Sequence, residues 1–304
     1  MNRPGTGLSF RMRHFKTYWG LLSTELSPRA SVIKIKINGQ CVNSCAFCKF
    51  HNDRRRLEAG DLAGFFDKIS FSRYKRIDIN GGEPTLHPHF SEICDFLKKR
   101  FKGKQVLYLG TNLIPLARRA SGSAAFKERY RNVLDTFDVI SVGCDDEHHN
   151  IDALEALGPE IIQSGHLLYV NVVTAYCSPG TKKRILSLQQ RLGMRVSFSD
   201  VHHFYAGRQM HDDRSLPCNR RVKELLINCN GDAFFCFHQE LEEPIFNLHT
   251  VTPAELNHFL NDYIPEPYHY CGCCPCYRPG LAKSLRASLS AIGANRRHGQ
   301  GNRM

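Results

Sequence analysis

Short runs with an apolar residue at every second position recur along the first 200 residues. Residues 32–37 read VIKIKI, where isoleucines alternate with lysines as on a half-buried strand. Between such runs, apolar side chains recur every three or four residues, and residues 90–101 place them on one helix face. The pattern therefore predicts strands that alternate with helices.

Six strands are expected before residue 200. They lie at about 32–37, 74–79, 105–110, 137–143, 167–175 and 194–199. The predicted helices between them lie at about 58–70, 90–101, 124–136, 151–163 and 181–192. Mostly apolar strands in this order favour an α/β fold, with a parallel sheet and helices on its outside. In such folds the chemistry gathers at the C-terminal ends of the strands.

The alternation of predicted strands and helices ends after residue 200. The runs VKELLIN and DAFFCFH flank Asn230-Gly231, which is a strong hairpin signal. A helix at about 253–263 follows, and then the cysteine-rich run 271–276. We predict four segments: a basic extension (1–30), a core (31–200), a small hairpin and helix domain (201–280) and a basic, flexible tail (281–304).

Charge is concentrated at the two ends of the chain. The net charge is +12, and residues 1–19 and 277–304 carry four and six basic side chains with no acid. Such ends can bind nucleic acid or an anionic surface, although solvation alone also explains them. No apolar run reaches the roughly 18 residues of a membrane span. The basic N-terminal residues contain no apolar core followed by small residues, so we do not expect a secretory signal. We expect a cytoplasmic protein that does not enter a membrane.

Thirteen cysteines raise the question of what the thiols bind. Disulfides suit short secreted chains, whereas closely spaced thiolates suit iron–sulfur clusters or zinc. Cys41, Cys45 and Cys48 follow the first predicted strand. Three thiolates leave one iron of a [4Fe–4S] cluster open for a small molecule. A zinc site here would take His51 as its fourth ligand.

The spacing is C-x3-C-x2-C, and the aromatic Phe47 precedes the last cysteine. This motif resembles that of the radical S-adenosylmethionine (SAM) superfamily. The resemblance implies a partial (β/α)6 barrel, in which the open iron binds the amino and carboxylate groups of SAM. An electron from the cluster then cleaves SAM to a 5′-deoxyadenosyl radical, which abstracts hydrogen from a substrate.

A second motif supports the resemblance. Gly81-Gly82-Glu83-Pro84 follows the second predicted strand and is similar to the family's Gly-Gly-Glu motif. The resemblance implies that the backbone and the glutamate receive the methionyl amine. The physics agrees, since glycines allow close approach and a carboxylate pairs with an ammonium group.

Further polar residues match family positions that contact SAM. They are Thr111, Asn112, Ser141 and Asn171. The family often has Ser-x-Asp after the fourth strand, and Gly143 stands here in place of the aspartate. A polar residue that ends a strand is the simpler interpretation of each.

The C-terminal cysteines resemble a second kind of site. Cys218-x12-Gly231-x4-Cys236 is similar to the opening of the twitch and SPASM domains, whose hairpin presents two thiolates. The resemblance implies an auxiliary [4Fe–4S] cluster that transfers electrons, and an external donor such as flavodoxin or ferredoxin. The thiolates that complete the cluster are Cys271 and Cys274, or alternatively Cys273 and Cys276. A structural zinc on the same thiols is the alternative.

The resemblance also indicates the class of reaction. Small twitch-type relatives oxidise or epimerise sugars of the aminoglycoside type, so we expect an oxidoreductase, a dehydrogenase or epimerase, with a small polar substrate. Modification of a ribosomal peptide is the alternative, and a zinc-bearing nucleic-acid-binding protein is the alternative of another class. Asp145 and His148 follow the fourth strand and could bind substrate or take a proton. Cys144 and Cys177 also follow strands and could return a hydrogen atom to a substrate radical, although a plain strand-end thiol explains both.

Overall fold

The computed structural model describes residues 17, 19–21, 31–46, 48, 53–69, 74–118, 124–199, 224–234 and 244–261. A nine-stranded sheet organises this part of the chain, in the order β11-β10-β9-β1-β4-β5-β6-β7-β8. Its strands are β1 (Val32–Lys36), β4 (Arg76–Asn80), β5 (Val106–Thr111), β6 (Val139–Gly143), β7 (Leu167–Val173), β8 (Arg195–Ser199), β9 (Glu224–Ile227), β10 (Asp232–Phe234) and β11 (Phe246–Asn247).

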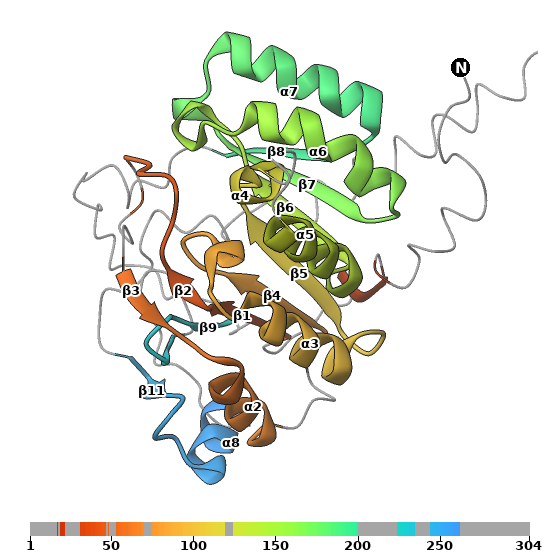
Figure 1. The fold of residues 1–304 in the computed structure, drawn as a ribbon. Helices are drawn as coiled ribbons and strands as arrows, with labels where there is room; N and C mark the ends of the chain where they lie inside the picture. The colour runs from red at the N-terminus through yellow and green to blue at the C-terminus, as the bar shows by residue number, and fades with distance from the viewer. Residues whose placement is uncertain are drawn as a thin grey trace, which may run out of the picture. The chain divides into compact units, whose positions relative to one another are not determined.

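Strand β1 and strands β4 to β8 are all parallel and follow one another in chain order. The connecting helices are α2 (Ala59–Asp67), α3 (Phe90–Phe101), α4 (Ile114–Ala117), α5 (Ala124–Thr136), α6 (Ile151–Gln163) and α7 (Pro179–Leu192), and α8 (Pro253–Asn261) comes last. Figure 1 shows α3 and α5 side by side over β4 and β5. The α/β class and the parallel sheet are therefore confirmed.

The two faces of the sheet differ because side chains alternate along each strand. Ile33 and Ile35 of β1 are 0% exposed and belong to the core cluster beneath the helices, as does Ile79 of β4. The opposite face is largely polar and aromatic, and we call it the polar face. It carries Lys34, Arg76, Asp78, Tyr108, Ser141, Tyr169, Asn171, Arg195 and Glu224.

Charges on the polar face are paired within the sheet. Arg76 makes two 2.5 Å hydrogen bonds to the Asp78 carboxylate and lies 4.4 Å from the centre of the Tyr108 ring. Lys34 and Glu224 form an ion pair at 2.8 Å. Because buried charges need partners, these two pairs lower the free-energy cost of placing charged side chains on the polar face.

The hairpin predicted after residue 200 is confirmed, since β9 and β10 are antiparallel. Its first strand also pairs in parallel with β1, so the hairpin extends the sheet of the core. The domain boundaries remain a prediction, because residues 201–223 and 262–304 lie outside the described part of the chain. Most of the basic extension lies outside it as well.

Several short elements were not predicted. Strands β2 (Asn38–Gly39) and β3 (Asp53–Arg56) form a separate two-stranded sheet beyond β1, and α4 follows β5. The sequence of β3 is DRRR, which carries no apolar alternation. None of the helices in the described ranges is both long enough and apolar enough to span a membrane.

Candidate functional site: a cysteine loop at the C-terminal edge of the sheet

Residues 41–48, which we call the cysteine loop, follow directly on β1 and β2. The Cys45 side chain is buried, and those of Cys41 and Cys48 are partly exposed. The Cys48 N–H donates to the Cys45 carbonyl at 2.9 Å, which closes a turn between these two cysteines. All three thiols are free. Burial, followed by the charges of Cys41 and Cys48, raises the pKa of the Cys45 thiol to about 12.

The Gly-Gly-Glu turn, residues 81–83, packs against the segment that leads into the cysteine loop. The Gly82 N–H donates to the Asn38 carbonyl at 2.9 Å, and the Glu83 N–H donates to the Gln40 carbonyl at 2.7 Å. A Cβ on Gly82 would lie 2.6 Å from the Gln40 carbonyl carbon. The glycine is therefore required by the chain's own close packing at this point.

The Glu83 carboxylate is enclosed by the ends of two neighbouring strands. Glu83 is 0% exposed and accepts hydrogen bonds from the Thr85 hydroxyl at 2.6 Å, the Thr111 hydroxyl at 2.8 Å and the Asn112 N–H at 2.6 Å. The Thr85 N–H adds a fourth donor group at 3.2 Å. Burial outweighs these donors and raises the pKa of the Glu83 carboxyl. Four donor groups of the chain thus bind the carboxylate that the sequence suggested as an amine acceptor. The next residue, Pro84, begins the short helix η2 (Pro84–Leu86).

Asn112 connects this arrangement to the cysteine loop. Its side-chain amide lies 3.7 Å from the Cys41 sulfur. The Asn112 backbone carbonyl accepts a 2.8 Å hydrogen bond from the side chain of Asn150. Asn150 is 1% exposed and also donates to the Gly143 backbone carbonyl at 2.7 Å. Asn150 could not be predicted as part of the site, because its neighbours in the sequence mark it only as a residue before a helix.

Ser141 and Asn171 meet on the polar face, where the Asn171 amide donates to the Ser141 hydroxyl at 2.7 Å. At Gly143, where the family often has an aspartate, the space beside the backbone is filled by the His148 ring. A Cβ on Gly143 would lie 2.7 Å from His148 Nε2, so the glycine makes room for the imidazole ring. Asp145, which is 1% exposed, holds the other ring nitrogen at 2.8 Å.

The two strand-end thiols differ in access. Cys144 is 0% exposed within the hydrophobic core, where burial raises its pKa to about 12. Cys177 is only partly buried, and burial again raises its pKa. Both thiols therefore stay protonated at neutral pH, and of the two only Cys177 reaches the surface.

Three thiols on one loop suit an iron–sulfur cluster, because thiolates are soft ligands for iron. Among the described residues, no group of three or more histidine, cysteine or acidic side chains has the geometry of a metal site. A [4Fe–4S] cluster binds each thiolate to a different iron, so its ligands need not converge on one point. Phe47 and His51 lie outside the described residues, as do the proposed ligands of the second cluster, namely Cys218, Cys236, Cys271, Cys273, Cys274 and Cys276.

Comparison with known proteins adds evidence on the fold. No family model matches the sequence, and no curated protein matches it. The crystal structure of SuiB from Streptococcus suis bound to the precursor peptide SuiA is similar, with a TM-score of 0.60 at 13% identity over 83% of this chain and 69% of that one. SuiB bound to S-adenosylmethionine gives a TM-score of 0.53 at 15% identity over 83% and 70% of the two chains. The chain and SuiB therefore share a fold.

The packing of the Gly-Gly-Glu turn can be tested with two glycines. Replacing Gly82 with alanine should lower the free energy of unfolding by about 1–3 kcal/mol, because the new methyl group overlaps the Gln40 backbone. The matched change Gly64→Ala, on α2 with no atom within 4 Å, should raise that free energy by about 0.5–1 kcal/mol. Urea denaturation measures both, and equal effects would contradict the close approach.

The buried carboxylate predicts a pH dependence. Because the folded-state pKa of Glu83 is raised above the ordinary 4.5, its contribution to stability is complete below pH 4.5 and is lost as the pH rises through the folded pKa. The free energy of unfolding of the wild type should therefore fall relative to that of Glu83→Gln as the pH rises above 4.5. Denaturation of both proteins across a pH series measures this difference. A difference that moves the opposite way would mean that the four donor groups hold Glu83 charged.

Proposed function

We propose that this chain, which has the radical SAM fold, is an enzyme that holds a [4Fe–4S] cluster on Cys41, Cys45 and Cys48 and cleaves SAM reductively. The observation that carries the proposal is the placement of the cysteine loop. Its sulfurs lie at the C-terminal edge of the parallel sheet, beside Asn112 at the end of β5 and Glu147 beyond β6. When bound, the cluster supplies the electron that splits SAM and yields the radical that takes hydrogen from the substrate.

The Gly-Gly-Glu turn would receive the methionyl amine of SAM through its backbone. The Glu83 carboxylate already accepts hydrogen bonds from four donor groups of the chain, so its part is to hold the turn and the end of β5 in place. Ser141 and Asn171 would contact SAM from the polar face, where they already bond to each other. Thr111 and Asn112 would support the site through Glu83.

A small polar substrate, of sugar or aminoglycoside type, suits the polar face. Hydroxyl and amino groups could exchange hydrogen bonds with the serine, asparagine and tyrosine side chains there. Oxidation of a carbinol or amine-bearing carbon also requires a group that accepts a proton. His148 is the candidate, because its bond to Asp145 fixes the ring orientation. Epimerisation would instead need a thiol that donates a hydrogen atom. Cys177 is the candidate, because it is partly exposed whereas Cys144 is buried.

Modification of a ribosomal peptide is the second candidate. It is favoured by one observation, which is that SuiB, whose fold this chain shares, was solved with a precursor peptide bound. The same radical chemistry would then act on a peptide side chain.

An auxiliary [4Fe–4S] cluster, held by Cys218 and Cys236 with Cys271 and Cys274, would accept the electron that a dehydrogenase removes from the substrate radical. The described hairpin supports this proposal. Gly231, the glycine of the twitch-like motif, has φ +88°, a conformation that favours glycine. An external reductant such as flavodoxin or ferredoxin would supply electrons in the cytoplasm.

Removal of the first thiols tests the proposal. After anaerobic reconstitution, changing Cys41, Cys45 and Cys48 together to alanine should halve the roughly eight irons of two clusters and abolish 5′-deoxyadenosine formation. The control Cys94→Ala removes a core thiol on α3 that is 1% exposed, and it should keep both the iron and the reaction. Iron analysis and chromatography measure the two quantities. Continued 5′-deoxyadenosine formation in the triple variant would refute the catalytic assignment.

The auxiliary cluster has a test of its own. Changing Cys218 and Cys236 together to alanine should remove about four irons and one spectral signal, while SAM cleavage without substrate turnover persists. Stoichiometric zinc with only about four irons in the wild type would overturn the second cluster.

The reaction can be read from the product formed in D2O with a panel of aminoglycosides. We expect oxidation, and mass spectrometry should then show a product two hydrogens lighter than the substrate. Deuterium on a product carbon that disappears in Cys177→Ala would indicate epimerisation instead. Methyl transfer or sulfur insertion would contradict both.

A further inference from the structure

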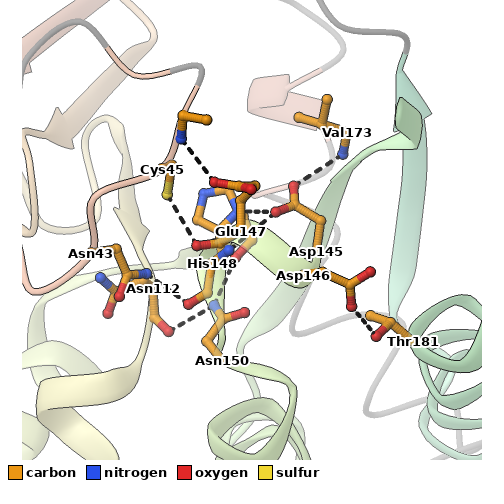
Figure 2. Close-up of polar contacts among 12 residues, drawn as sticks. Asn43, Cys45, Asn112, Asp145, Asp146, Glu147, His148, Asn150, Val173 and Thr181 are labelled. Atoms are coloured by element: carbon orange, nitrogen blue, oxygen red, sulfur yellow. Dashed lines mark hydrogen bonds and ion pairs between the residues drawn. The ribbon is translucent and has the colours of Figure 1, made fainter. Parts of the chain in front are cut away.

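A turn of acidic residues beyond β6 contacts the cysteine loop from a distant part of the sequence. This turn, residues 145–150, contains the short helix η4 (Asp146–His148). The Asn43 side chain donates to the His148 carbonyl at 2.6 Å, and the Cys45 sulfur lies 3.4 Å from the Glu147 carbonyl oxygen (Figure 2). The Ala46 N–H donates to the Glu147 carboxylate at 2.8 Å. One turn therefore contacts three positions of the cysteine loop.

The turn itself is anchored on the side that faces away from the loop. The Asp145 carboxylate accepts from His148 Nδ1 at 2.8 Å and from the Val173 N–H at the end of β7 at 3.3 Å. The Asp146 carboxylate accepts from the Ser178 N–H at 2.5 Å and from the Thr181 hydroxyl at the start of α7. Figure 2 shows Asp146 and Thr181 on the far side of the turn from Cys45. These anchors fix the turn to two elements outside the cysteine loop.

The three carboxylates of the turn thus have separate partners. Asp145 and Asp146 bind β7, α7 and the turn itself, whereas Glu147 binds the backbone of the residue next to Cys45. A hydrogen bond to that backbone N–H restrains the loop between its second and third cysteines. It also places a negative charge beside a thiolate that would ligate iron.

We propose that Glu147 is a positioning residue for the cluster. Glu147 holds the cysteine loop in its iron-binding conformation, and its charge lowers the reduction potential of the cluster on that loop. The inference rests on the proposed function, since it concerns the same cluster. Outer groups orient the ligands of a metal centre, and nearby charge and hydrogen bonds set the potential of an iron–sulfur cluster. A negative charge opposes the addition of an electron, so its removal should make the potential more positive.

Three variants separate the two effects. Glu147→Ala removes both the acceptor and the charge, Glu147→Gln keeps an acceptor oxygen for the Ala46 N–H and removes only the charge, and Asp146→Asn removes a charge from the adjacent residue that faces α7. Iron per chain after reconstitution reports on positioning. The midpoint potential, followed by electron paramagnetic resonance, reports on charge. The relevant cluster is the one whose signal the Cys41, Cys45 and Cys48 triple variant lacks.

We expect Glu147→Ala to lose at least half of the iron of this cluster and Glu147→Gln to restore it. Glu147→Gln should also have a more positive midpoint potential than both the wild type and Asp146→Asn. Iron retained in full by Glu147→Ala would overturn the positioning role, and equal shifts in Glu147→Gln and Asp146→Asn would overturn the effect of charge. Failure of the proposed function is distinct, because the wild type itself would then assemble no cluster on the cysteine loop.

Discussion

A single buried carboxylate organises the edge of the sheet on which the site is built. Glu83 is 0% exposed, and enclosing an anion is costly unless its oxygens are satisfied. Donors come from Thr85 beside it and from Thr111 and Asn112 at the end of β5, so the ends of two strands are fixed relative to each other. The backbone of the same turn pairs with residues 38–40, which lead into the cysteine loop. The turn that carries this carboxylate therefore holds the segment from which the cysteine loop starts.

A chain of hydrogen bonds extends the constraint from β5 to β6 and α7. Asn112 lies against Cys41 and accepts from Asn150, and the turn that ends at Asn150 contacts the cysteine loop through Glu147 and His148. Gly143 contributes to this arrangement, because a residue without a side chain leaves room for the His148 ring. The loop is thus supported on both sides by rigid strand ends, a requirement for any site that must hold a cofactor in one position.

Much of the fold could be predicted because its strands and helices are long and periodic. The helix predicted at 124–136 has those bounds, and the parallel strands lie within two residues of their expected positions. Strand β3 was missed because DRRR has no apolar alternation. The pairing of β9 with β1 joins residues 192 positions apart, such as Val32 and Glu224, and no local pattern encodes it. In the candidate site, spacing singled out the cysteines and the Gly-Gly-Glu turn, and the structure packs that turn against the segment before the cysteine loop. The enclosure of Glu83 and the contact of Glu147 with Ala46 depend on how strand ends meet in space, so the sequence could not reveal them.

Under the proposed function, three thiolates hold a cluster with one open iron that binds SAM. Mössbauer spectroscopy of the protein reconstituted with 57Fe, recorded before and after addition of SAM, tests it most directly. One iron of the cluster on Cys41, Cys45 and Cys48 should change its isomer shift when SAM is added, while the other three keep theirs. A spectrum that SAM leaves unchanged would mean that no open iron binds SAM there.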